Sequence, residues 1–383
     1  CAGQALTRLV SVAMIMFTLI FGANRLDVAS YQSGIMVAIA FESLVNLVAL
    51  VTIAVFALRL SKGFDPGQVS NSANAVFQQT TITPSFWVLT LVSAATIFCL
   101  PRMFQITFVE CLSDDHLRYA RRGFSLYLVA IAAAVFVISW VGNQVLAGTE
   151  VASDTYVLAL PLGNDNQLLG LLAFIGGFSA ATAMIIVASL TLSQMLSNDV
   201  ILPLLMRRQK ARNTIPDYSK ALILTRRLTV IAVILMAWLY QHSLAENVAL
   251  TAIGLIAFAL AVQLAPAILF GLYWNRGNAM GVFAGLACGT LIWFITLMIP
   301  LLSNAGFIDP QILTDGFFGN ALLRPDHLFG LSFSDSYTRG VVLSLAANIT
   351  AYTLVSSRDK TRLSDRIQAV AFVNRDREKQ HAN

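Results

Sequence analysis

The chain has 383 residues, of which 57% are hydrophobic and 12% are charged, with a formal net charge of +5. Soluble domains carry about 25% charged residues, so this composition excludes an ordinary soluble domain and indicates a membrane protein. The basic residues are distributed among apolar segments, which argues against a nucleic-acid partner despite the net positive charge.

Nine segments approach the roughly 20 apolar residues that a membrane-spanning helix needs. In chain order they are residues 9–22, 35–58, 85–109, 124–147, 168–195, 222–240, 248–274, 280–299 and 340–356. We therefore predict an all-α polytopic membrane protein with about nine transmembrane helices. With alternating loops, 19 of the 25 Lys and Arg residues fall on the side of the C-terminal tail and five on the other. The positive-inside rule then places the tail in the cytoplasm.

Glu42 and Arg102 lie well inside predicted spans, where a charge costs about 3 kcal/mol and needs a reason. Glu42 is in the second span and Arg102 in the third, each about 10 Å from the predicted cytoplasmic end at 1.5 Å per residue. Opposite charges at one depth predict a Glu42–Arg102 pair or a shared aqueous cavity. A purely structural ion pair, or Arg102 extending to the inner interface, explains the same pattern.

The third span also contains Pro101 and Gln105 beside Arg102. Pro101 removes one helical hydrogen bond and predicts a kink or an opening of the helix at this depth. An opened helix exposes backbone groups that can coordinate an ion or a polar solute, whereas a kink alone has only a structural role.

The fifth span is rich in small and hydroxyl residues, among them Ser179, Thr182, Ser189 and Ser193. Such hydroxyls either bond back to the carbonyl one turn earlier or line a polar path. In the seventh span, Gln263 and Pro266 interrupt an apolar run. We take Ser179, Thr182 and Gln263, together with the residues of the second and third spans, as candidate solute- or ion-binding residues.

The four His and four Cys residues lack the spacing of a metal site, and no catalytic triad or phosphate-binding loop is present. The sequence therefore predicts no catalytic residue, no metal and no cofactor in this chain. Polar residues that interrupt apolar spans favour transport or solute sensing instead.

The chain resembles the sodium/solute symporter family over nearly its whole length, most clearly in TAIGLIAFALAVQLAPAILFGLYWNRGNAMGVFAGLACG at 251–289. Within that family, LPRMFQITFVE at 100–110 is similar to the transporter-like input region of CbrA-type hybrid sensor histidine kinases. The runs FGANRLDVASYQSGIMVAIAFES at 21–43 and RLSDRIQAVAFV at 362–373 resemble the same branch.

The resemblance implies a LeuT-like inverted-repeat core in a bacterial inner membrane, with the nine spans as core helices four to twelve. Residues 1–356 would form a symporter-like transmembrane domain that lacks its first helices. Residues 357–383 would be a cytoplasmic tail that leads to connector and kinase domains in cis.

Sodium-coupled members of the family have two adjacent hydroxyl residues on core helix eight. In this chain the corresponding positions are Ala183 and Met184, which lack the side-chain oxygens that a hard cation requires. A shift of one residue would bring in Thr182 as a single hydroxyl. This departure disfavours Na⁺ coupling and favours proton coupling or sensing without an ion.

Three hypotheses follow. The first is the membrane region of a sensor histidine kinase that binds a small polar nutrient, with an amino acid such as histidine as a candidate, and signals to kinase domains in cis. The second is a stand-alone sodium- or proton-coupled symporter. The third is a membrane scaffold that binds no solute.

Overall fold

The computed structural model describes residues 33–61, 83–109, 111, 113–146, 149, 151–209, 219–244, 250–274, 276–316, 324–325 and 335–358, with positions 12, 15, 16 and 18. All regular structure within these residues is helical. The chain divides into two compact units, and each is described by itself. Unit 1 comprises Cys1–Thr81 and Gln105–His242, and unit 2 comprises Ile82–Phe104 and Ser243–Asn383.

The helices of unit 1 include two π-helices (η1, η3) and one 3₁₀ helix (η2). Their bounds are α2 Ser33–Ser61, η1 Gln105–Val109, α6 Asp114–Val145, η2 Ser153–Thr155, α7 Tyr156–Gly163, α8 Gln167–Met195, η3 Leu196–Ile201, α9 Leu202–Gln209 and α10 Ser219–Leu244. The helices of unit 2 include one 3₁₀ helix (η4) and one π-helix (η5). Their bounds are α4 Pro84–Cys99, α5 Pro101–Phe104, α11 Leu250–Ala261, η4 Val262–Leu264, α12 Ala265–Tyr273, α13 Ala279–Trp293, η5 Phe294–Met298, α14 Ile299–Asn304, α15 Gln311–Asp315 and α16 Ser336–Arg358.

Seven helical segments of the described chain are long and apolar enough to cross a membrane. They are Met36–Ser61, Asp115–Val145, Gln167–Arg207, Ser219–Tyr240, Thr251–Tyr273, Ala279–Asn304 and Ser336–Arg358. The pair Pro84–Cys99 and Pro101–Phe108, bent by 57°, is an eighth if it forms one span. These eight match the second to ninth predicted spans and confirm a multi-pass membrane protein. The first predicted span, 9–22, lies almost wholly outside the described residues, as does most of the predicted tail.

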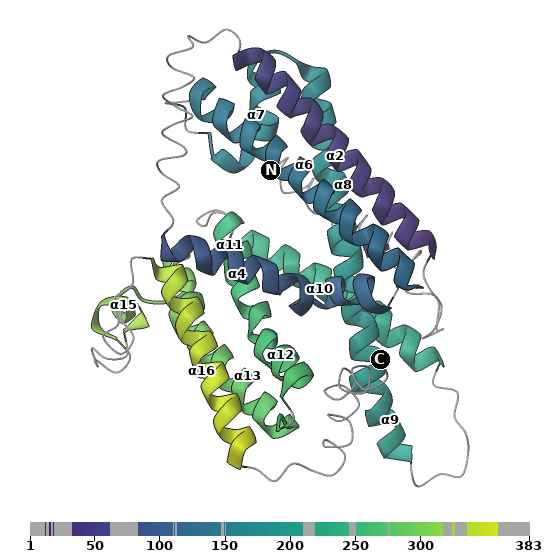
Figure 1. Ribbon diagram of the computed structural model, residues 1–383, viewed down its shortest axis with the longest axis vertical. Helices are drawn as coiled ribbons and strands as arrows, with labels where there is room; N and C mark the ends of the chain where they lie inside the picture. The colour runs from purple at the N-terminus through teal and green to yellow at the C-terminus, as the bar shows by residue number, and fades with distance from the viewer. Residues whose placement is uncertain are drawn as a thin grey trace, which may run out of the picture. The chain divides into compact units, whose positions relative to one another are not determined.

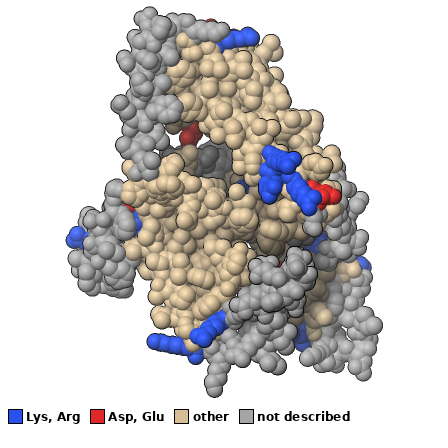
Figure 2. Space-filling view, viewed as in Figure 1, with Lys and Arg blue, Asp and Glu red and all other residues tan. Residues whose placement is uncertain are grey.

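Most apolar side chains of these spans point away from the protein interior. Only 17–33% of the most apolar part of each span is buried within the protein. The face drawn in Figure 2 is accordingly mostly uncharged, and the charged side chains gather at a few places on it. Apolar residues on the outside of long helices are expected when lipid, and not water, surrounds them.

Two helix boundaries differ from the predicted ones. The helix predicted to begin at 124 begins at Asp114, because Ser113 caps it by accepting a hydrogen bond from the backbone N–H of His116 at 3.4 Å. The span predicted to end at 195 continues through η3 to Arg207. In addition, α7 forms in the segment 148–167, between two predicted spans, and Leu160 of α7 is fully buried.

In unit 1, α2 packs against both α6 and α8 (Figure 1). Their contact is a cluster of small and branched apolar residues: Ile53, Ala54, Ala57, Ala134, Ile138, Val141, Leu160 and Ala173. Alanine at four of these positions allows the helix axes to approach closely, which is the main source of attraction between helices in lipid.

In unit 2, the most extensive packing is between α13 and α16 (Figure 1). Glycines recur every fourth residue along α13, at Gly281, Gly285 and Gly289, and all three are buried. A Cβ atom built on Gly285 would lie 2.7 Å from Asn348 Oδ1 and 3.0 Å from the backbone oxygen of Asn348. Glycine is therefore required at this helix crossing, where any side chain would force the two helices apart.

Candidate functional site

The packing of α2 on α8 changes from apolar to polar along its length. At the apolar part, a Cβ atom on Gly176 would collide with Ala49 Cβ and lie 3.8 Å from Asn46 Cα. The two helices are antiparallel, since Ala49 meets Gly176 while Glu42 meets Thr182. This geometry places Glu42 and Thr182 about two turns from the close contact, on the faces by which the helices pack.

Glu42 and Thr182 form the polar part of this interface. Thr182 Oγ1 lies 3.5 Å from Glu42 Oε1 and 2.8 Å from the carbonyl oxygen of Ser179. A threonine hydroxyl has one proton to donate, and the shorter contact is with the carbonyl. Because the hydroxyl has a single proton, donation to the Ser179 carbonyl leaves the Glu42 carboxylate without a donor from Thr182.

A further donor placed between Glu42 and Thr182 would satisfy both oxygens in that state. A proton on Glu42 lets the acid donate to Thr182, and a bound cation or N–H group can contact both oxygens. Glu42 and Thr182 thus meet through their side chains within unit 1, with the backbone carbonyl of Ser179 beside them. We treat the three as one candidate site, and the predicted role of the Ser179 hydroxyl stays a prediction.

The other hydroxyls of α8 have a structural role in this arrangement. Ser189 donates to the carbonyl of Ile186 at 3.0 Å, and Ser193 donates to that of Leu190 at 2.8 Å. Both serines are buried, and their hydroxyl groups are satisfied by their own helix. Of the two interpretations of the sequence, these bonds support hydrogen bonding to the preceding turn and not a polar path. Ala183 and Met184 follow Thr182 on α8, and Met184 is half-exposed. Neither supplies a side-chain oxygen to the Glu42 site.

The predicted kink at Pro101 is confirmed. Leu100 is extended, with φ −74° and ψ 123°, and it ends α4 while Pro101 begins α5. Proline disfavours the helical conformation of the residue before it, which accounts for the 57° bend. Arg102 and Gln105 follow within two turns and are half-buried, and neither side chain hydrogen-bonds to another described residue. Their role as solute ligands stays a prediction.

Gln263 lies in a fully hydrogen-bonded polar cluster of unit 2. Its amide nitrogen donates to Ser344 Oγ at 2.9 Å and to the carbonyl of Ala259 at 3.3 Å. Asn348 Nδ2 donates to both the backbone oxygen of Gln263, at 2.7 Å, and its side-chain oxygen, at 3.1 Å. The three side chains are at most 2% exposed. This cluster fastens the 3₁₀ turn of η4 to α16, so the described contacts of Gln263 stabilise the helix break.

The sequence interpretation missed two polar partners. Ser344 and Asn348 are four residues apart on α16, and this spacing of polar residues in an apolar helix was the available signal. Arg226, counted among the loop charges, is instead 2% exposed within α10 and donates to Asn198 Oδ1 at 3.3 Å. Nothing in the sequence pattern indicates that the side chain of Arg226 is buried.

The remaining prediction concerns Glu42 and Arg102. They belong to different units, and their pairing stays a prediction. Within the described residues, no group of three or more His, Cys, Asp and Glu side chains could hold a metal ion. Comparison of the chain with protein-family models, with curated proteins and with solved structures finds no match.

Proposed function

We propose that this chain is the solute-binding membrane region of a sensor histidine kinase, and that it binds a small polar nutrient and transmits occupancy to kinase domains in cis. The observation that carries the proposal is the Glu42–Thr182 contact at 3.5 Å inside packed, membrane-spanning helices. An ionisable side chain at this depth costs about 3 kcal/mol and marks a functional site by default.

The ligand class follows from the chemistry of the site. A carboxyl oxygen, a hydroxyl oxygen and a nearby carbonyl present acceptors, so the site suits a solute with N–H donors, such as an amino acid with its ammonium group. Histidine remains one candidate. The resemblance to the CbrA-type kinases supports the signalling output and a LeuT-like core in a bacterial inner membrane, with the C-terminus in the cytoplasm.

A stand-alone symporter is the second candidate. It is favoured by the capacity of Glu42 and Thr182 to hold a proton between two oxygens, which is what proton coupling requires. Coupling to sodium is less well supported than coupling to protons, because Ala183 and Met184 offer no side-chain oxygen.

The test uses the full-length protein in proteoliposomes and a panel of labelled amino acids. We expect one or more of them to raise the phosphorylation of the kinase domains, and Glu42→Gln or Thr182→Val to weaken that response at least tenfold. Ser193→Ala is the matched control, since its hydroxyl bonds only to the carbonyl of Leu190 on the same helix.

Uptake separates the two candidates. Accumulation driven by a proton or sodium gradient, without ligand-dependent phosphorylation, would favour the symporter. If neither uptake nor a phosphorylation response is found with any amino acid, the scaffold hypothesis replaces both.

A further inference from the structure

The first turns of α6 form an exposed, charged extension of a membrane-spanning helix. Every residue from Asp115 to Leu126 is exposed, and the side chain of Arg118 is 80% exposed. All charged residues of α6 lie between Asp114 and Arg122, whereas 123–145 carries no charge. The helix therefore has an uncharged part that suits lipid and a charged part that does not.

The length of α6 determines where the charged part lies relative to the bilayer. At 1.5 Å per residue, the uncharged stretch 123–145 is about 35 Å long, enough to cross a hydrocarbon core of about 30 Å. Arg121 and Arg122 then lie within about 3 Å of its end, and Arg118 about 8 Å from it. A headgroup layer is about 5–8 Å thick on each side, so all three arginines are at the depth of the lipid phosphates.

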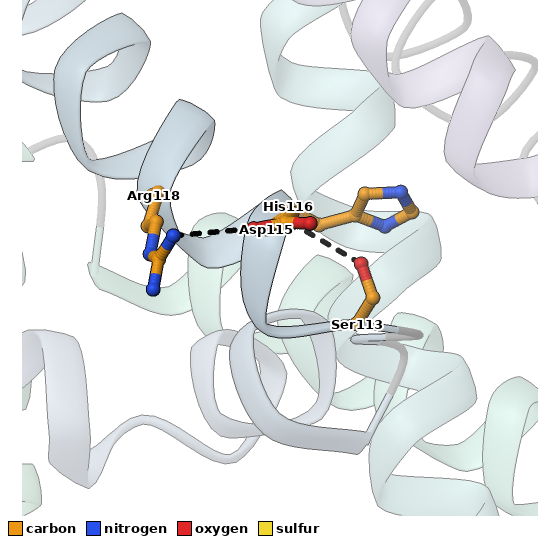
Figure 3. A network of polar contacts seen from close by, with 4 residues as sticks. All are labelled: Ser113, Asp115, His116 and Arg118. Atoms are coloured by element: carbon orange, nitrogen blue, oxygen red, sulfur yellow. Dashed lines mark hydrogen bonds and ion pairs between the residues drawn. The ribbon is translucent and has the colours of Figure 1, made fainter.

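The three arginines share one side of the helix. Arg118, Arg121 and Arg122 are at positions i, i+3 and i+4, and we call this set the arginine face. Figure 3 shows that Arg118 reaches Asp115, with 3.5 Å between Nη1 and Oδ1. No ion pair joins Arg121 or Arg122 to another described residue. On the face drawn in Figure 2, several basic side chains cluster beside an acidic one.

We propose that the arginine face binds the headgroups of anionic phospholipids. A guanidinium group is planar and donates two parallel hydrogen bonds to a phosphate, and it is less strongly hydrated than a lysine ammonium. Tyr119, 77% exposed on the same turns, suits the membrane interface, where tyrosine is enriched. The backbone amides at the start of α6 are not part of this surface, since the arginine side chains supply the contacts. The inference does not depend on the solute proposed above.

The experiment titrates the full-length protein in detergent with dioleoylphosphatidylglycerol and, separately, with dioleoylphosphatidylcholine, and resolves the first bound lipid by native mass spectrometry. We expect tighter binding of the anionic lipid, unaffected by 10 mM inorganic phosphate. An arginine near an anionic surface contributes about fivefold. Because Asp115 offsets part of Arg118, the variant R118Q/R121Q/R122Q should lose about 25-fold of this preference. R118K/R121K/R122K should keep most of it.

The matched control is R207Q/R276Q/R358Q, which removes three exposed arginines, two from other helices and one from the turn between α12 and α13. These three arginines come from separate segments of the chain and are not neighbours on one helix, so the control should lose clearly less of the preference than R118Q/R121Q/R122Q. If the site variant is not recovered folded, Arg121→Gln alone should still cost about fivefold. Equal affinity for the two lipids in the wild type would overturn the proposal, and so would an equal loss in the control. Competition by inorganic phosphate would assign the surface to a free anion instead.

Discussion

The glycine seam between α13 and α16 yields a prediction whose magnitude can be worked out from the packing. In Gly285→Ala, the new Cβ would lie 2.7 Å from Asn348 Oδ1, 2.9 Å from Tyr352 Cβ and 3.0 Å from the backbone oxygen of Asn348. A side chain can rotate away, but a backbone carbonyl moves only if the helix moves. Overpacking of this kind costs about 1–3 kcal/mol, and replacing a helical glycine by alanine returns about 0.5–1 kcal/mol.

The expected net change is therefore a loss of up to about 2.5 kcal/mol in the free energy of unfolding. For a chain of 383 residues that corresponds to a melting temperature lower by up to about 3 °C, measured by size-exclusion chromatography after heating in detergent. The control is Gly254→Ala in α11, where a Cβ would meet no atom within 4 Å. Gly254→Ala should leave the melting temperature unchanged or raise it. Equal melting temperatures for the two variants would refute the close helix approach.

Two further predictions address the polar cluster and the bend. Asn348→Leu should lower the free energy of unfolding by about 1–3 kcal/mol, because it leaves the buried side-chain oxygen of Gln263 without its donor; an unchanged urea or detergent unfolding curve would contradict this. Pro101→Ala restores a backbone N–H and should straighten the 57° bend, lengthening the distance between spin labels at Trp87 and Phe108 by about 4 Å in a pulsed electron-spin measurement. An unaltered distance would show that packing, and not proline, sets the bend.

The number and order of the spans could be predicted from the sequence because lipid imposes a simple rule: about 20 apolar residues for each helix. The bend at Leu100 could be predicted for a similar reason, since proline acts on its own backbone neighbours whatever surrounds them. Such local causes are visible in the sequence. The start of α6 at Asp114 was missed because a hydropathy criterion ignores the charged turns that Ser113 caps.

Contacts between distant residues could not be predicted in the same way. Glu42 and Thr182 are 140 positions apart, and nothing near either residue indicates the other. The sequence argument looked for an opposite charge and proposed Arg102, a pairing that stays a prediction. The contact that the structure describes for Glu42 is with a hydroxyl group. Likewise, Gln263 bonds to Ser344 and Asn348 of α16, and three glycines of α13 allow α16 to approach closely.

Gln263 and Glu42 were equally good candidates in the sequence, and their surroundings now separate them. Both amide atoms of Gln263 have partners of good geometry, so a solute that used them would first have to break these bonds, at a cost of about 1–3 kcal/mol for each group left unpaired. Glu42 has one long contact, at 3.5 Å, with a hydroxyl that also lies 2.8 Å from the carbonyl oxygen of Ser179. A ligand that brings a proton, a cation or an N–H group adds a favourable contact there and breaks none. The capacity to bind therefore lies where the hydrogen bonds are incomplete, and this criterion favours Glu42 and Thr182 over the better-connected Gln263.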